Sequence, residues 1–222
     1  MSMGIPDKID PNQKPYLLYE GIEYKDFWRE SDNRSRLDEL EREIIREFLP
    51  ASGKRIVDLG CGFGRLTDCY LDRFKQAILF DASISLLQQA QEMTKGKGWF
   101  IAGDINHLPF RAASFDNVLM VRVFHHIPDS QRCLSEVSRI LSHRGEFIFS
   151  YSNKRNLARI AAYLLGRDQN NPFSLDTFGL DTTLIRHHPH YVDGLLSKSG
   201  FEKLQHRGVG VVDKFSNKRG PF

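Results

Sequence analysis

The sequence predicts a doubly wound α/β domain, and three observations support that prediction. Short apolar runs alternate with helix-length amphipathic stretches over residues 56–152. The runs are rich in Val, Ile, Leu and Phe through their middles, which is typical of strands covered on both faces. The first run leads into a glycine loop. Strands that alternate with helices form right-handed βαβ units and a mostly parallel sheet.

The helices and strands are expected in a regular order. A helix over 35–49 comes first, because its apolar residues recur at helical spacing and Pro50 and Gly53 end it. Its apolar stripe consists of Leu37, Leu40, Ile44, Ile45, Phe48 and Leu49. Strands are expected at 55–60, 77–81, 99–104, 115–123 and 145–152, with helices at 65–74, 84–95 and 130–142. Ser83 is the expected N-cap of the helix after the second strand.

A segment over residues 153–190 interrupts this alternation. It begins with a helical pattern that is basic on one side and continues as a loop-rich stretch. A helix at 191–200 and a late strand at 201–212 then resume the pattern. We therefore expect one domain over 35–222 with an insertion at about 153–190, preceded by an N-terminal arm over 1–34.

The composition argues against several classes of protein. The chain has 222 residues and a formal net charge of +3, which is too small without clustering to predict a nucleic-acid partner. Its N-terminus has no apolar segment of the kind found in secretory signals, and no apolar run approaches the roughly 18 residues that would span a bilayer. Cys61, Cys69 and Cys133 are scattered, so we expect reduced thiols in a cytoplasmic protein.

The glycine loop after the first strand is the strongest functional signal. Gly60, Gly62 and Gly64 stand at every second position and follow Asp58. A phosphate loop would need Lys and Ser or Thr after the last glycine, where this chain has Arg65 and a leucine. A dinucleotide fingerprint would place the third glycine one residue later, and a carboxylate at position 58 favours an ammonium group over a diphosphate. A loop that makes only a tight turn is the alternative.

Acidic residues also end the next two strands. Asp81 lies 21 residues after Gly60, where an acid accepts hydrogen bonds from the hydroxyls of a ribose. Asp104 ends the third strand, where a carboxylate can accept a hydrogen bond from the exocyclic amine of adenine. Each could instead cap a helix, since Asp is a favoured N-cap. Three acids at three successive strand ends favour a ligand with a ribose and an adenine.

These motifs resemble those of a known family. The stretches "VDLGCGFG", "FDAS", "AGD", "FDNVLMVRVFHHIPD", "LSEVSRILSHRGEF" and "SGFE" follow one another as in class I S-adenosylmethionine-dependent methyltransferases, and they most resemble methyltransferase type 11. The likeness covers about residues 35–207 and is most specific over 56–152. It implies a Rossmann-like sheet whose last strand is antiparallel and lies beside the fifth. Either "GVGVVDKF" supplies that strand, or the strand is missing or shortened.

The resemblance implies S-adenosyl-L-methionine as the cofactor and S-adenosyl-L-homocysteine as its product. The implied cofactor-binding residues are Asp58, Gly60, Cys61, Gly62, Gly64, Asp81, Ala82, Asp104, Ile105, Val121 and Arg122. Within this set, Asp81 would hold the ribose hydroxyls, and Asp104 and Ile105 would flank adenine. Val121 and Arg122 would face the methionine end.

Two histidines after the fourth strand are the candidates for a general base. Methyl transfer from a sulfonium is an in-line displacement, so alignment and the exclusion of water are the main tasks. A hydroxyl, thiol or protonated amine acceptor would also use a base, and His126, followed by His125, is expected near the methyl group. Either could instead be a capping or supporting residue. The "HHPH" stretch, 187–190, has no Asp or Cys nearby in sequence to complete a metal site, so no metal is expected.

Aromatic residues of the arm are candidates for a lid over the site. Tyr19, Tyr24 and Trp28, together with Tyr151, could line a lid or an acceptor pocket, although the arm residues could equally pack the arm onto the domain. We expect a methyltransferase that acts on a small-molecule acceptor, without a nucleic-acid partner or a membrane span. The alternatives are an NAD(P)-dependent oxidoreductase and a non-catalytic protein of the same fold that binds S-adenosylmethionine.

Overall fold

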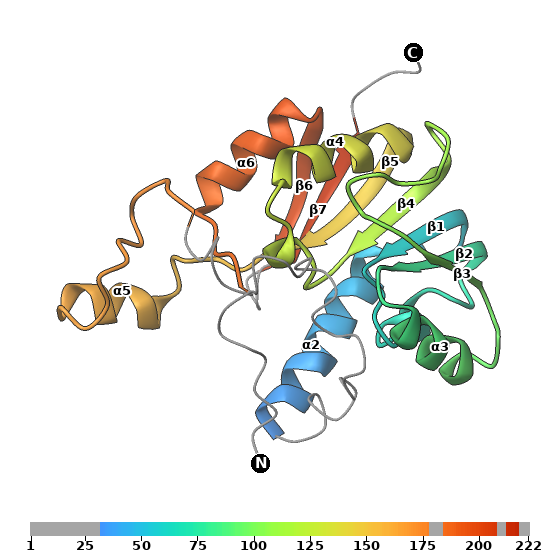
Figure 1. The fold of residues 1–222 in the computed structure, drawn as a ribbon, viewed down its shortest axis with the longest axis horizontal. Helices are drawn as coiled ribbons and strands as arrows, with labels where there is room; N and C mark the ends of the chain where they lie inside the picture. The colour runs from blue at the N-terminus through green and yellow to red at the C-terminus, as the bar shows by residue number, and fades with distance from the viewer. Residues whose placement is uncertain (1–31, 178–183, 208–211, 218–222) are drawn as a thin grey trace.

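A sheet with helices on both faces forms the body of the protein (Figure 1). The computed structural model describes residues 32–177, 184–207 and 212–217, and the described strands follow the order β3-β2-β1-β4-β5-β7-β6. The strands are β1 (Gly53–Leu59), β2 (Phe74–Asp81), β3 (Trp99–Ala102), β4 (Phe115–Met120), β5 (Leu141–Ser150), β6 (Phe201–Arg207) and β7 (Val212–Asn217). The pairs from β3 to β5 are parallel, so the predicted doubly wound sheet is confirmed.

The last strand, β7, is antiparallel and lies between β5 and β6. It pairs with β5 from Glu146 opposite Ser216 to Ser150 opposite Val212. The second half of the stretch "GVGVVDKF", residues 212–215, therefore lies in the return strand, and the alternative of a missing strand is wrong. Strand β6 ends at Arg207, earlier than predicted, and residues 208–211 lie outside the described part of the chain.

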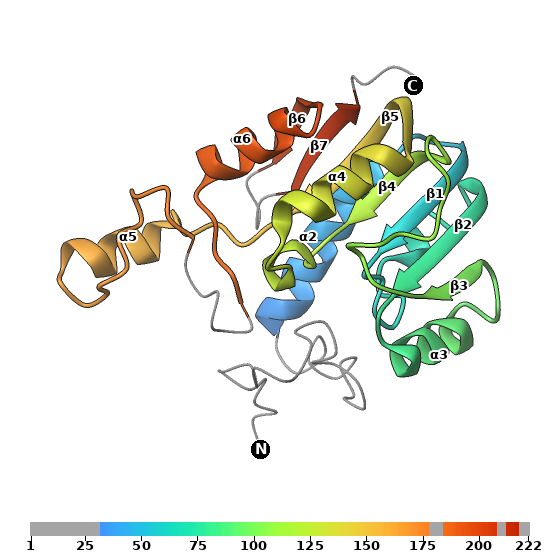
Figure 2. The same cartoon turned by 45° about the horizontal axis from the view of Figure 1, so that its top comes forward.

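Helices cover both faces of the sheet (Figure 2). These helices are α2 (Asp32–Phe48), α3 (Ile84–Met93), α4 (Ser130–Ile140) and α6 (Pro189–Lys198), whereas α5 (Leu157–Leu164) lies away from the sheet. Alternate residues of β1 serve the two faces: Ile56 packs in a cluster with Ile45 of α2, whereas Val57 packs in a cluster with residues of α4 and α6. The predicted N-cap of α3 is confirmed, because the Ser83 hydroxyl accepts a hydrogen bond from the Leu86 N–H at 3.2 Å.

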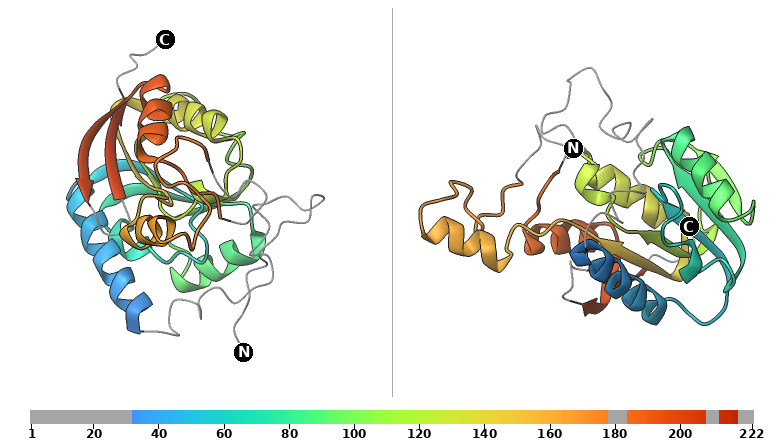
Figure 3. Two further views of the ribbon diagram at one scale, coloured as in Figure 1. Left: turned by 90° about the vertical axis from the view of Figure 1, so that its left-hand side faces the viewer. Right: turned by 90° about the horizontal axis from the view of Figure 1, so that it is seen from below.

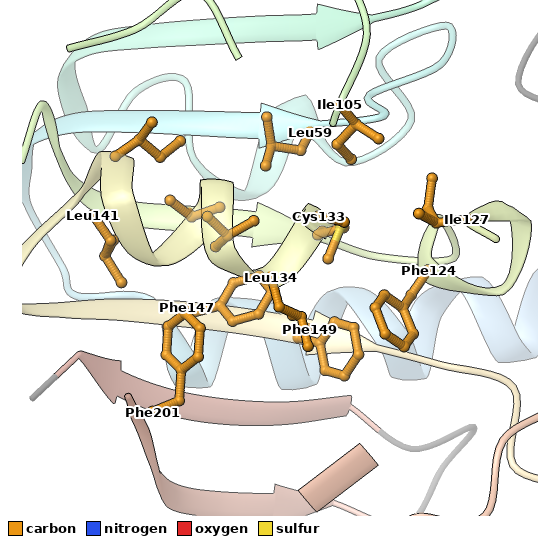
Figure 4. Close-up of a cluster of buried hydrophobic side chains, with 14 of the residues drawn as sticks. Leu59, Ile105, Phe124, Ile127, Cys133, Leu134, Leu141, Phe147, Phe149 and Phe201 are labelled. Carbon is orange, nitrogen blue, oxygen red and sulfur yellow. The ribbon is translucent and has the colours of Figure 1, made fainter. Parts of the chain in front are cut away.

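The cluster beneath α4 contains several aromatic side chains among its aliphatic ones (Figure 4). Phe124, Phe147, Phe149 and Leu134 are completely buried in it. The Phe124 and Phe149 rings meet edge to face with centroids 4.8 Å apart, an arrangement that adds to the stabilisation from burial. Burial of one such side chain contributes about 1.5–3 kcal/mol. This cluster holds the carboxyl end of β4 and the turn that follows it.

Residues 65–74 do not form the predicted helix. They form turns around a short 3-10 helix, η2 (Thr67–Cys69), and β2 already begins at Phe74. The early start of β2 leaves too few residues for a helix and its connections. The turns also carry Tyr70 inward, so that its side chain is completely buried.

The predicted apolar stripe of α2 is wrong at one position. Leu40 is 43% exposed, whereas Glu41 is only 1% exposed. The helix is therefore rotated so that a carboxylate faces the sheet. Burial of a charge is costly unless it is paired, and two arginines from other elements pair with Glu41.

Candidate active site

A cavity opens at the carboxyl ends of β1, β2 and β4, as expected for ligand sites in open α/β sheets. Its lining residues are Asp58, Gly60, Cys61, Gly62, Phe63, Arg65, Leu66, Phe80, Asp81, Ala82, Leu86, Gly103, Ile105, Val121, Arg122, Val123, His126 and Ile127. Most of the predicted site residues are brought together here. Gly64, Asp104, His125 and Tyr151 do not line the cavity.

The glycine loop has a conformation that side chains disfavour. Gly60, Gly62 and Gly64 all have positive φ, at 73°, 56° and 81°. A Cβ at Gly60 would lie 2.3 Å from a methyl carbon of Val123, while a Cβ at Gly62 would meet nothing within 4 Å. The first glycine is therefore required by packing, and the second leaves space beside the loop. Gly64 faces α3, because a Cβ there would contact Met93 and Ala90.

Asp81 holds the loop in place. One carboxylate oxygen accepts the Gly62 N–H at 2.8 Å, and the other accepts the Ser83 N–H at 2.9 Å. The Gly60 N–H also donates to the Phe80 carbonyl at 2.7 Å. Asp81 therefore has a structural contact with the loop in addition to its place in the cavity wall.

Asp58 lines the cavity and is 3% exposed. The Tyr70 hydroxyl donates a hydrogen bond to it at 2.9 Å. Burial raises the pKa of Asp58 to about 7, because the stabilising contributions of the Tyr70 hydrogen bond and of Arg65 are smaller. This carboxyl group therefore changes its charge near neutral pH. Tyr70 is not predicted from the sequence, because its stretch has the pattern of a helix.

A buried carboxylate joins the loop, α2 and the end of β4. Glu41 accepts the Arg65 Nη2–H at 2.8 Å and the Arg122 Nε–H at 2.9 Å. Arg65 also pairs with Asp38. Arg122 has φ of +61°, and its N–H donates to the Ser150 hydroxyl at 2.7 Å. These contacts hold a non-glycine residue in the left-handed region, which is costly without such support.

The two candidate bases have different surroundings. His126 lines the cavity from the 3-10 turn η3 (Phe124–His126), with its ring centroid 4.2 Å from that of His125. The His125 carbonyl accepts the Ile185 N–H at 2.7 Å, which ties it to the late part of the insertion. Burial, followed by the neighbouring cations, holds the pKa of His125 well below its usual range.

The other predicted site residues lie near the cavity or outside the described part of the chain. Gly103 and Ile105 line the wall, but the Asp104 carboxylate accepts the Asn106 N–H at 2.9 Å and lies 3.1 Å from His107 Nδ1. Tyr151 is 4% exposed and stacks on Phe149 in the core. Tyr19, Tyr24 and Trp28 lie outside the described residues.

The "HHPH" stretch has structural contacts. His188 caps α6, since its Nδ1 accepts the His190 N–H at 3.2 Å. His187 is buried between Phe124 and Tyr191, and neither of its ring nitrogens has a partner in the described structure. Burial lowers the pKa of His187 to about 4, so this ring is neutral at physiological pH. No three potential metal ligands gather in the described part of the chain.

The cavity fits a nucleoside that carries a positively charged group. The open space beside Gly62 allows a ligand to approach the backbone, and Phe80 and Ile105 provide apolar walls for a base. Asp81 offers an acceptor for ribose hydroxyls, and Asp58 can become a counter-ion for an ammonium group. The fold and cavity together define a doubly wound α/β protein whose cavity has the chemistry to receive a nucleoside ligand.

Comparisons with known proteins define the family. Residues 57–149 match the model of the methyltransferase domain. The chain is 31% identical to an uncharacterized protein of Methanocaldococcus jannaschii over 62% of its own length and 58% of that protein's length. It is 32% identical to a protein of Encephalitozoon cuniculi that is provisionally named a methyltransferase, over 68% of this chain and 71% of that protein.

The fold comparison agrees with this. The structure of magnesium protoporphyrin IX methyltransferase from Synechocystis with bound S-adenosylhomocysteine has a TM-score of 0.69. It covers 90% of this chain and 96% of that protein at 15% identity, so the likeness concerns the fold. The chain belongs to the class I S-adenosylmethionine-dependent methyltransferases. This family assignment does not favour the NAD(P)-dependent alternative.

Proposed function

We propose that this protein transfers a methyl group from S-adenosylmethionine to a small-molecule acceptor. One observation supports this most directly: the glycine loop, Asp81 and the end of β4 line a single cavity at the carboxyl edge of the sheet. The membership in the methyltransferase family supports the choice of cofactor. The described helices include none long and apolar enough to cross a membrane. A small acceptor also fits the modest net charge of +3, which offers no general affinity for nucleic acid.

Each part of the cavity has a proposed task. Asp81 binds the ribose hydroxyls while it holds the loop through Gly62, and Ile105 packs against adenine. Asp58 faces the ammonium group. Val121 and Arg122 form the cavity wall at the methionine end. Asp104 is the weakest member of this set, because its carboxylate is engaged with Asn106 and His107. The cofactor supplies a methyl group on a positively charged sulfur.

His126 is the proposed general base, if the acceptor has a proton to lose. Its place in the cavity wall supports this role, whereas His125 is not among the residues that line the cavity. His125 is then a supporting residue that packs against the His126 ring. Replacement of His126 by Asn would lower kcat while the affinity for the cofactor stays unchanged. The matched His125→Asn variant should retain more activity.

Calorimetry with S-adenosylmethionine, S-adenosylhomocysteine and NAD tests the proposal. We expect binding of the first two ligands only, and a large loss of affinity in Asp81→Ala. Asp116→Ala is the control, because Asp116 lies at the opposite end of β4, where it accepts the Arg55 N–H. Equal binding by the wild type and Asp81→Ala, or absence of binding to both sulfur ligands, would refute the assignment. A radiolabelled methyl donor with panels of small acceptors then distinguishes an enzyme from a non-catalytic binding protein.

A further inference from the structure

Part of the insertion stands away from the body of the domain. Helix α5 and the loop after it project to one side of the sheet (Figure 3). None of the α5 residues is buried, whereas α3, α4 and α6 each bury several side chains. A short helix is marginally stable in water by itself, so the conformation of α5 depends on its contacts with the rest of the insertion.

The outward face of α5 is apolar. Leu157, Leu164 and Leu165 are 85%, 70% and 65% exposed. With Ala161, which is also exposed, they recur at the i, i+4, i+7 and i+8 spacing of a single helix face. Phe173 and Leu175 in the following loop are also exposed. An exposed apolar helix face of this kind indicates a site of interaction.

Contacts within the insertion hold this face in place. The Arg155 guanidinium lies 5.7 Å from the centre of the Phe173 ring, and the Tyr163 ring meets that of Phe173 edge to face. Asn156 caps α5 by accepting the Arg159 N–H at 2.9 Å. The buried Lys154 donates to the Asp176 carbonyl at 2.6 Å. The leucines therefore point outward because the opposite side of the helix is already in contact with the loop.

Basic residues border the apolar face. Residues 153–190 contain five Lys or Arg and three Asp, an excess of two positive charges within a chain whose net charge is +3. Arg155 and Arg167 are exposed and flank the two ends of α5. An apolar helix face bordered by arginines complements an anionic lipid surface, where the leucines enter the acyl boundary and the arginines meet the headgroups.

We propose that the face formed by Leu157, Ala161, Leu164 and Leu165 docks on an anionic membrane surface. The base of the insertion joins the cavity region, because the His187 N–H donates to the Ser152 carbonyl at 2.9 Å and the Ile185 N–H to the His125 carbonyl. Docking would therefore bring the side of the protein that carries His125 close to the bilayer. This interaction does not depend on the proposed methyl transfer.

Sedimentation of the full chain with vesicles tests the proposal. We expect binding to phosphatidylcholine vesicles that contain about one third phosphatidylglycerol, little binding to phosphatidylcholine alone, and weaker binding at high salt. The Leu164→Gln/Leu165→Gln variant should bind at least about tenfold more weakly, which corresponds to about 1.4 kcal/mol. Ile84→Gln is the control, because Ile84 is 60% exposed on α3.

Three outcomes would overturn the proposal. One is equal sedimentation of the wild type and the leucine variant. Another is the absence of binding to the anionic vesicles. The third is a concentration-dependent dimer, seen in sedimentation velocity, that the leucine variant does not form. A second copy of the protein would then be the occupant of this face. Calorimetry with S-adenosylhomocysteine on the same variants shows whether the cofactor site is intact, so the two proposals can fail separately.

Discussion

At the scale of single residues, Asp58 makes stability depend on pH. Its pKa is raised by burial from 3.8 to about 7. A group whose pKa is higher in the folded state takes up a proton on folding, so its contribution to stability is complete below pH 3.8 and is lost as the pH rises through 7. The Tyr70 hydrogen bond can persist with an amide at this position, because its carbonyl oxygen is also an acceptor.

Replacement of Asp58 by Asn therefore should remove this pH dependence. Relative to the variant, the wild type should lose stability steadily between about pH 4 and pH 7 and should change no further above that range. Urea unfolding of both proteins at several pH values measures the difference between their free energies of unfolding. The contributions of the other titrating groups cancel in this difference. A difference that is constant across the whole range would show that Asp58 is ionised in the folded protein throughout.

Glu41 is the second residue with a large expected effect. Replacement by Gln leaves two guanidiniums, those of Arg65 and Arg122, without their buried counter-ion. We expect a loss of about 3 kcal/mol in the free energy of unfolding, in line with the cost of breaking a buried ion pair. Glu39→Gln on the exposed side of α2 is the control and should change stability by less than about 0.5 kcal/mol. If both variants unfold at the same urea concentration, the buried network contributes no net stability.

At the scale of elements, the glycine loop contains one glycine that packing requires and another that leaves room for a ligand. Gly60→Ala would combine a strained positive φ with a contact of 2.3 Å to Val123, so we expect a loss of about 3 kcal/mol in stability. Gly62→Ala has only the strain, about 1 kcal/mol, but its methyl group would enter the cavity and should weaken binding of S-adenosylhomocysteine.

Thermal unfolding and calorimetry on the two variants measure these effects. The double variant Gly60→Ala/Val123→Ala should recover part of the lost stability, because the smaller side chain removes the clash. No recovery in the double variant would assign the whole cost to the backbone conformation. Unchanged ligand affinity in Gly62→Ala would show that the ligand does not approach the backbone at this glycine.

The elements also show what could be predicted from sequence. The apolar runs and the acids at their ends predicted the sheet and most of the cavity wall, because strand ends in a parallel sheet converge at one edge. The stretch 65–74 was misassigned, since its helical pattern is overridden by the start of β2 at Phe74 and the burial of Tyr70. Glu41 was missed because its partners, Arg65 and Arg122, are distant in sequence. Periodicity cannot reveal a charge whose burial depends on such contacts.

At the scale of the whole molecule, the three cysteine thiols lie in three different hydrophobic clusters. Cys133 lies in the cluster beneath α4, Cys69 in the cluster beneath α2, and Cys61 in the cluster with α3. All three are buried, and burial raises the pKa of each thiol, to about 11 for Cys69. Thiolate is the reactive form, so both access and ionisation limit reaction in the folded state.

We therefore expect the three thiols to react with Ellman's reagent at one slow rate, set by cooperative opening of the whole domain. S-adenosylhomocysteine at about 100 times its Kd should slow this reaction by about 100-fold, if the open state does not bind the ligand. Mass spectrometry of partly labelled protein identifies which of the three thiols react first. Fast labelling of Cys61 alone would contradict a single slow rate, because it would show that this thiol is reached from the cavity or through opening of the glycine loop while the clusters around Cys69 and Cys133 stay closed.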